Sequence, residues 1–184
     1  MEDISLHILD IVENSVAAGA SAVNIAVCED IPGDVLDIEI SDNGKGMSKE
    51  ILRKATDPFF TSKTVRKVGL GLTLLKQAAE MANGTFSINS KEGRGTIVKV
   101  SFQYSHIDRQ PLGDIGKTIE VLVIGNPGVD FHYEHKKDGF LSTFDTKRIR
   151  KVLSKMSINS TKGIEIVRES LKKTERYLSK AESR

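Results

Sequence analysis

Residues 35–47, VLDIEISDNGKGM, run from a strand-like segment into a turn that contains two glycines. Apolar side chains alternate over Val35–Ser41, which predicts a strand. Asp42 follows directly, and a carboxylate at a strand end is well placed to accept a hydrogen bond from an exocyclic amine such as that of adenine. Gly44 and Gly46 permit tight turns and close approach of a ligand to the backbone. Taken alone, D-x-G-x-G is also a common turn.

A helix is predicted upstream of this segment. Residues 3–18 place their apolar side chains, together with Ser15, on one arc. Asp10 and Asn14 are four residues apart and project side by side from the predicted helix. An amide oxygen is a suitable Mg²⁺ ligand, and a carboxylate one turn away can accept a proton from an attacking water or hydroxyl. For this pair alone, a solvated helix face is the favoured interpretation.

A second glycine-containing segment, Gly69-Leu70-Gly71-Leu72, opens a helix predicted over Leu70–Ala82. Free N–H groups at a helix N-terminus, with the positive end of the helix dipole, can form an anion site. Taken alone, a glycine-hinged helix start that packs on a sheet is an equally good interpretation. Lys63 and Lys67 add positive charge, and the irregular stretch 56–68 is typical of a functional lid. A P-loop and a Rossmann unit are excluded, because neither GxxxxGKS/T nor a GxGxxG after a strand occurs.

The remaining elements of the first hundred residues predict the fold class. They are strands over Val23–Cys28, Thr85–Asn89 and Gly95–Phe102, and a short helix over Lys49–Ala55 with Ser48 as its N-cap. Gly93-Arg94-Gly95-Thr96 is interpreted as a hairpin turn. The order of helices and strands lacks the regular alternation of a parallel sheet, so an antiparallel α+β layer is predicted.

Residues 105–184 are predicted to form an extension of unknown role. Ile119–Ile124 and Val129–His135 predict a β-hairpin around an Asn-Pro-Gly turn, and Asp145 is a predicted N-cap of the first of two basic helices. Those helices favour a solvated face or a docking surface for an acidic protein partner.

Four side chains in this extension permit a metal hypothesis. Asp130, His132 and Glu134 share one face of the predicted strand, whereas His135 lies on the other. An exposed sheet edge is the favoured interpretation of this cluster.

The order and spacing of the motifs resemble one known family. Residues 11–20 are similar to the N box of MutL-type mismatch-repair ATPases. Residues 57–63, 69–72 and 95–96 resemble the ATP-binding domain of sensor histidine kinases. Both groups belong to the GHKL superfamily of gyrases, heat-shock chaperones, histidine kinases and MutL, and the resemblance covers roughly residues 1–103. It implies the Bergerat fold, a two-layer α/β sandwich whose mixed, mostly antiparallel sheet carries helices on one face.

The resemblance also implies residue roles, with ATP and Mg²⁺ as cofactors. The residue matched by Asn14 binds Mg²⁺, the one matched by Asp42 bonds the adenine amino group, and Asp10 takes the place of the general base. The further nucleotide-binding positions implied are Gly44, Gly46, Met47, Lys63, Gly69, Leu70, Gly71, Leu72 and Thr96.

The chain departs from the family pattern at two points that bear on function. The general base is usually Glu, and Asp10 is one methylene shorter. Misplacing a catalytic group by ~1 Å can cost about a hundredfold in rate, so slow or absent hydrolysis is expected. A phosphoacceptor helix pair before the N box is not expected, and His7, inside the N-box helix, is interpreted as a packing residue.

The expected function is therefore an ATP-Mg²⁺-binding regulatory protein that lacks its own phosphoacceptor histidine domain. One alternative is a protein kinase that phosphorylates a His or Ser of a partner in trans. In its stand-alone form the chain resembles the anti-sigma-factor kinases, which phosphorylate a Ser of a partner protein. The other is a slow ATPase that couples lid closure to dimerisation.

Composition bounds the remaining expectations. The net charge of +2 over 184 residues is too small to imply nucleic acid or membrane as the main partner, and a protein partner is expected. Cys28 is the only cysteine, which excludes an intramolecular disulfide and a thiolate metal cluster. The acidic start and the interrupted apolar segment behind it predict a cytoplasmic location. The predicted division is an ATP-binding domain over 1–104 and the extension over 105–184, with the oligomeric state left open.

Overall fold

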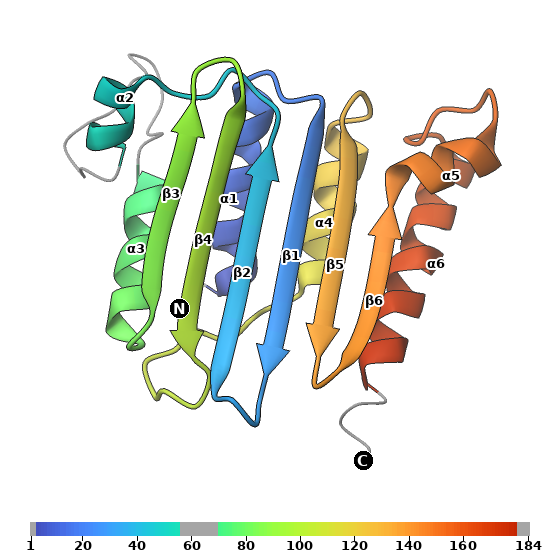
Figure 1. Cartoon of the computed structure of the whole chain (residues 1–184). Coiled ribbons are helices and arrows are strands. Elements are labelled where there is room, and N and C mark those ends of the chain that lie inside the picture. The colour runs from blue at the N-terminus through green and yellow to red at the C-terminus, as the bar shows by residue number, and fades with distance from the viewer. Residues whose placement is uncertain (1–2, 56–69, 180–184) are drawn as a thin grey trace.

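The computed structural model describes residues 3–55 and 70–179, and one six-stranded sheet lies at its centre (Figure 1). The strands are β1 (Ala22–Asp30), β2 (Val35–Asp42), β3 (Thr85–Lys91), β4 (Gly95–Gln103), β5 (Asp130–Lys137) and β6 (Phe140–Asp145). Their order in the sheet is β3-β4-β2-β1-β5-β6, and every neighbouring pair is antiparallel except β1 and β5. The sheet is therefore mixed and mostly antiparallel, as predicted.

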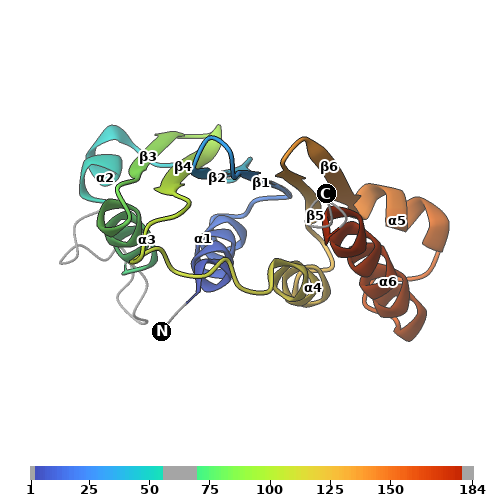
Figure 2. The same ribbon diagram turned by 90° about the horizontal axis from the view of Figure 1, so that it is seen from below.

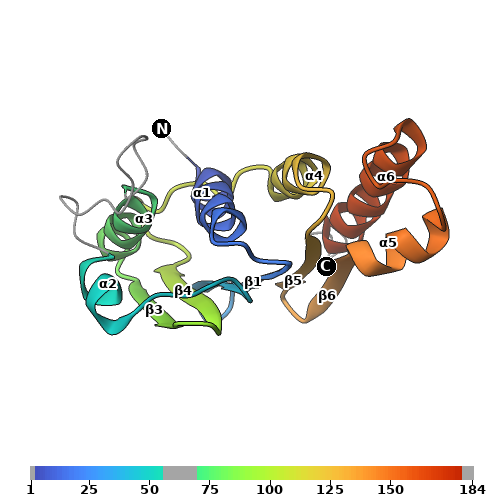
Figure 3. The same cartoon turned by 90° about the horizontal axis from the view of Figure 1, so that it is seen from above.

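Helices cover one face of this sheet. They are α1 (Ile4–Ala17), α2 (Lys49–Lys54), α3 (Leu70–Met81), α4 (Ile115–Gly125), α5 (Thr146–Leu153) and α6 (Thr161–Leu178). Figures 2 and 3 show α1, α3, α4 and α6 on the same side of the strands, which confirms the two-layer architecture. In the described parts of the chain, no helix is both long enough and apolar enough to cross a membrane.

The first helix begins where the sequence predicts. Asp3 is its N-cap and accepts a hydrogen bond from the Leu6 N–H through its side chain. The N–H groups of Ile4 and Ser5 donate to the carbonyls of Pro111 and Leu112, over 2.9 and 3.0 Å. The segment after β4 therefore satisfies N–H groups that the first turn of any helix leaves without a partner.

Alternating burial on the central strands forms the core between the sheet and the helices. The buried members are Val23, Ile25 and Val27 on β1, Leu36, Ile38 and Ile40 on β2, and Val98, Val100 and Phe102 on β4. Fully burying one such side chain contributes about 1.5–3 kcal/mol. The strands predicted in the first hundred residues are confirmed, each somewhat longer than its pattern indicated.

The strand predicted over Ile119–Ile124 is wrong, because these residues lie inside α4. Asp114 is the N-cap of this helix and accepts from the Lys117 N–H over 2.7 Å. The buried apolar positions are Ile115, Ile119, Leu122 and Val123. Their spacing is helical, and it lets α4 pack against both α1 and α6.

The hairpin of the C-terminal part is instead formed by β5 and β6, which meet at Asp138 and Gly139. Both residues have positive φ, +44° and +86°, as tight hairpin turns require. Asp145 follows as the N-cap of α5, which confirms that prediction. Because β5 pairs with β1, one sheet runs across the predicted division at residue 104, and that division stays a prediction.

Candidate functional site

A cavity of about 420 Å³ opens between α1, α2, the start of α3 and the adjoining ends of β2, β3 and β4. Its volume is in the range of small-ligand sites. Its apolar walls are formed by Ile11, Ile40, Met47, Ile51, Leu72, Ile88 and Val98. Its polar lining comes from Asn14, Ser15, Asp42, Lys45 and Thr96. A cavity with apolar walls and a few polar groups suits a flat heterocycle that needs orientation.

The Asp42 carboxylate is held in place from two sides. Its Oδ2 accepts a hydrogen bond from the Ser15 hydroxyl, and its Oδ1 accepts one from the Gly44 N–H, each over 2.8 Å. Ser15 is buried on α1, whereas Asp42 is half-buried at the end of β2. An ionised carboxylate has about four acceptor positions, so Asp42 retains capacity for a further donor from the cavity.

Two glycines let the turn after β2 and the turn between β3 and β4 approach each other closely. Gly95, at the start of β4, has φ +87°, and a Cβ there would collide with the carbonyl of Asp42. Gly46 has φ +63°, and a Cβ there would collide with the carbonyl of Lys91. The turn between β3 and β4 is thus the predicted hairpin turn, and it also supports the cavity wall from behind.

Thr96 is oriented by Ser90, which lies opposite it on β3. The Ser90 and Thr96 hydroxyls are hydrogen-bonded over 2.9 Å, and Ser90 also donates to the Gly95 carbonyl over 3.0 Å. The Met47 N–H donates to the same Ser90 oxygen over 2.9 Å. The part-buried Ser90 hydroxyl therefore joins the turn after β2 to the cavity wall formed by β3 and β4.

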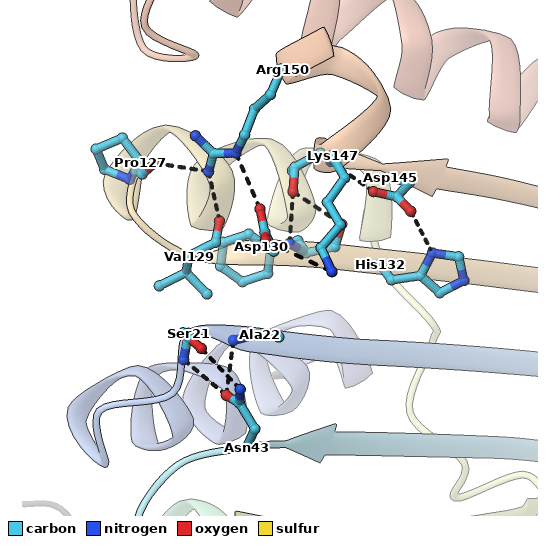
Figure 4. Close-up of polar contacts among 12 residues, drawn as sticks. Ser21, Ala22, Asn43, Pro127, Val129, Asp130, His132, Asp145, Lys147 and Arg150 are labelled. Atoms are coloured by element: carbon cyan, nitrogen blue, oxygen red, sulfur yellow. Dashed lines mark hydrogen bonds and ion pairs between the residues drawn. The ribbon is translucent and has the colours of Figure 1, made fainter.

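Asn43 fixes the turn after β2 to the start of β1 (Figure 4). Its Oδ1 accepts from the N–H groups of Ser21 and Ala22, both over 2.9 Å, and its Nδ2 donates to the Ser21 hydroxyl over 2.9 Å. These three bonds restrain the residue next to Asp42, so the carboxylate does not depend on its own two bonds alone.

Asn14 lines the cavity from the last turn of α1, and its side chain is half-buried. Asp10, one turn earlier, is exposed and does not line the cavity. A Cβ placed on Gly71 would lie 3.1 Å from the Asp10 Cβ, so the glycine lets α3 begin directly beside Asp10. Of the two residues predicted to project side by side, Asn14 lines the cavity and Asp10 lies at its margin.

The sequence profile of the histidine kinase-, DNA gyrase B- and HSP90-like ATPase family matches residues 2–106, which contain all of these side chains. The chain belongs to this family. Membership implies ATP binding by the domain that carries the cavity, as the motifs predicted.

Named relatives resemble the ATPase domain over part of their length. Sporulation kinase B of Bacillus subtilis is 32% identical over 96 residues, covering 50% of this chain and 22% of that protein. The non-motile and phage-resistance protein of Caulobacter vibrioides is 34% identical over 98 residues, covering 50% of this chain and 12% of that protein. The chain therefore spans only a small part of the length of either relative.

A solved structure extends the likeness in fold. The MutL ATPase domain of Aquifex aeolicus, complexed with ADP, matches with a TM-score of 0.54 at 16% identity. The match covers 83% of this chain and 69% of that one. Because the family profile ends at residue 106, the likeness in fold reaches into the residues that follow the ATPase domain.

The other predicted positions of the ATPase domain are only partly described. Leu72 lines the cavity and Leu70 opens α3, whereas Lys63 and Gly69 lie outside the described residues. So does the predicted lid, 56–68. Sequence reasoning missed Ser15 and Ser90 as positioning groups. A polar residue on the apolar arc of α1, one position after Asn14, was the signal for Ser15.

The histidines of the chain have local partners. His7 is buried and its Nε2 lies 2.9 Å from the Gln110 Oε1, which confirms its packing role. His132 lies 3.0 Å from Glu134 and 3.4 Å from Asp145. Among the residues that the structure describes, no group of three His, Cys, Asp or Glu side chains is arranged to hold a metal ion.

Proposed function

We propose that the chain binds ATP together with Mg²⁺ in the cavity around Asp42, and that a partner protein responds to this nucleotide state. One observation carries the proposal: a half-buried carboxylate, held by Ser15 and Gly44, lies in an apolar-walled cavity of about 420 Å³. Membership of the ATPase family supports ATP as the ligand. Asp42 and Asn14, which both line the cavity, are the groups that would orient it.

Adenine recognition follows from the chemistry of Asp42. The carboxylate only accepts hydrogen bonds, so it suits the exocyclic amine of adenine. Guanine presents a carbonyl at the corresponding edge position, which would leave the carboxylate facing another acceptor. Ile40, Ile88 and Val98 form apolar surface on which the flat ring can be buried. We therefore expect ATP to be preferred over GTP.

Asn14 is the residue that would hold the metal ion. Its amide oxygen is a neutral, hard ligand, and Mg²⁺ takes few protein ligands when phosphates and water complete its shell. The ion, when bound, would offset the charge of the phosphates. Lys45, exposed at the rim of the cavity, adds a positive charge to the same margin.

Calorimetric titration with a non-hydrolysable ATP analogue tests this function. Binding should require Mg²⁺ for full affinity, and Asn14→Ala should remove most of the metal dependence while nucleotide binding without metal is little changed. The matched control is Asn24→Ala on β1, which lies outside the cavity. Absence of binding by the unmodified chain would refute the proposed function.

Transfer of phosphate to a partner is a second candidate. It is supported by the kinase named among the relatives and by Asp10, whose carboxylate lies at the margin of the cavity beside Gly71. The chain would then label a His or Ser of its partner from γ-labelled ATP. Label on the partner that disappears with Asn14→Ala would support this function, and label on the isolated chain alone would contradict it.

A further inference from the structure

The segment from α5 to the start of α6 is strongly basic. Residues 146–164 contain six Lys or Arg and no Asp or Glu. Two of the cations are used inside the fold, because Arg150 and Lys147 both pair with Asp130. Within the described residues, the other three on α5 and the turn after it form no ion pair. They are Arg148, Lys151 and Lys155, and all are exposed.

Exposed apolar side chains lie among these three cations. Val152 is 72% exposed and Met156 is 47% exposed. Arg148, Lys151 and Val152 share one face of α5, because residues three and four apart are neighbours on a helix. Lys155 and Met156 follow in the turn directly after it. We call these five residues the α5 patch.

The backbone under the α5 patch is firmly attached to the sheet (Figure 4). Arg150 donates through Nε to Asp130, and through its terminal nitrogen to the carbonyls of Pro127 and Val129, over 2.8–3.1 Å. The opposite face of the helix buries Ile149 and Leu153 in the core. A rigid, pre-organised surface loses little conformational freedom on binding, which favours docking.

We propose that the α5 patch docks an acidic, amphipathic helix of a partner protein. Three cations without an acidic neighbour on the patch are complementary to carboxylates, and two apolar side chains between them are complementary to one or two apolar anchors. Helix recognition of this kind uses anchors three and four residues apart, which matches the spacing of the patch. The patch lies at the far end of the sheet from α2 and α3, so a docked helix would leave the ATP cavity open (Figure 1).

The same features disfavour two other classes of partner. Proteins that bind duplex DNA through its phosphates make about 6–10 such contacts, whereas the patch offers three cations. Binding to an anionic membrane surface is typical of clusters of about 4–8 Lys or Arg, and the patch has three. A short protein segment, with a few carboxylates and one or two apolar side chains, is the occupant that fits the three cations and two apolar side chains of the patch.

A designed peptide tests the docking surface directly. The probe is a fluorescein-labelled helix of about 18 residues, with leucines at helical spacing flanked by glutamates. Its counterpart carries glutamine in place of every glutamate. Fluorescence anisotropy at low salt should show binding of the glutamate peptide to the full chain, weakening as salt rises, and little binding of the glutamine peptide.

Charge reversal at the patch locates the binding. Arg148→Glu, Lys151→Glu and Lys155→Glu together should weaken binding about tenfold or more. Val152→Ser with Met156→Ser should weaken it about threefold or more through the lost apolar contact. The matched control reverses three other exposed cations, Lys136, Lys162 and Lys173, and should leave affinity nearly unchanged.

Other outcomes would overturn the inference. These are no binding of the glutamate peptide, equal loss in the control variant, or tighter binding of a DNA duplex of about 20 base pairs or of phosphatidylserine vesicles. Because the probes are tested without nucleotide, failure here leaves the ATP-binding proposal intact.

Discussion

The Ser15 hydroxyl donates to the Asp42 Oδ2 over 2.8 Å and thereby joins the buried face of α1 to the end of β2. Because one oxygen of Asp42 is fixed by this bond, the other acceptor positions have a defined direction in the cavity. Ser15→Ala should weaken binding of an ATP analogue about fivefold, the cost of one hydrogen bond to a charged group being about 1 kcal/mol or more.

The control for Ser15→Ala is Ser87→Ala, an exposed serine on β3 outside the cavity. It should leave affinity unchanged in the same calorimetric titration. Equal affinities for Ser15→Ala and the unmodified chain would show that Asp42 is positioned without Ser15.

Asp42→Asn should change which base the cavity accepts. An amide retains the size of the side chain but presents N–H donors as well as an acceptor. We expect ATP binding to weaken by ~1–3 kcal/mol and the preference over GTP to shrink. Competition between ATP and GTP, measured for the variant and for Asp37→Asn on the same strand, gives the comparison. If Asp42→Asn leaves the preference for ATP over GTP unaltered, base recognition lies elsewhere in the cavity.

The sequence was sufficient for the elements that carry the cavity, because each has a strong local pattern. Asp3 and Ser48 cap helices, and alternation over Val35–Ser41 leads into Asp42. It was not sufficient for α4. The run Ile119–Ile124 is rich in β-branched residues, as strands are. The Asp114 N-cap and the contacts of α4 with α1 and α6 favour the helix instead.

The hairpin between β5 and β6 has a local signal in the sequence. Asp138-Gly139 is a typical turn pair, but Asn-Pro-Gly earlier in the chain is an equally strong turn signal and predicts the hairpin at the wrong place. The parallel pairing of β5 with β1 joins residues more than a hundred positions apart, and no local pattern specifies it. The contact between Ser15 and Asp42 is non-local in the same sense.

Gly95→Ala should destabilise the fold strongly. The residue has φ +87°, and its new Cβ would collide with the Asp42 carbonyl. A strained left-handed residue costs about 1–3 kcal/mol, and the collision adds to this cost. Gly93→Ala is the control, because Gly93 has φ +73° but nothing within 4 Å of its Cβ position. Urea unfolding should show a clearly larger loss for Gly95→Ala, and equal losses would contradict the close approach.

Glu29 should make stability depend on pH in the acid range. Burial raises its pKa, but hydrogen bonds from His135 and Tyr104 and the charge of Lys137 outweigh burial, so the pKa lies below its ordinary value. The ionised carboxylate therefore stabilises the fold above the ordinary pKa, and this contribution is lost as pH falls through the lowered one. Stability should decline below about pH 5.

Glu29→Gln tests this relationship by urea unfolding at several pH values. The variant should have a lower free energy of unfolding at pH 7 and a shallower decline in acid, because the titrating group is gone. Glu39→Gln, which removes an exposed ion pair with Lys99, should change stability by less than about 1 kcal/mol. An unchanged acid decline in Glu29→Gln would exclude Glu29 as its source.

Turnover of ATP should be slow because Asp10 is shorter than Glu and lies at the margin of the cavity. Asp10→Glu extends the carboxylate by one methylene and should raise single-turnover phosphate release by about tenfold or more. Asp10→Asn should abolish the residual turnover, whereas Glu13→Gln, on the exposed side of α1, should not. Phosphate release that is indifferent to all three variants would remove Asp10 from the reaction.

The most direct measurement is a ¹H–¹⁵N correlation spectrum of the chain recorded with and without a non-hydrolysable ATP analogue and Mg²⁺. The account predicts that the largest shifts occur at the backbone amides of Gly44, Gly46 and Thr96 and at the side-chain amide of Asn14. Shifts confined to the region of Glu29 and His135, near the opposite end of β1 and β5 from Asp42, would contradict it, as would a spectrum that does not change.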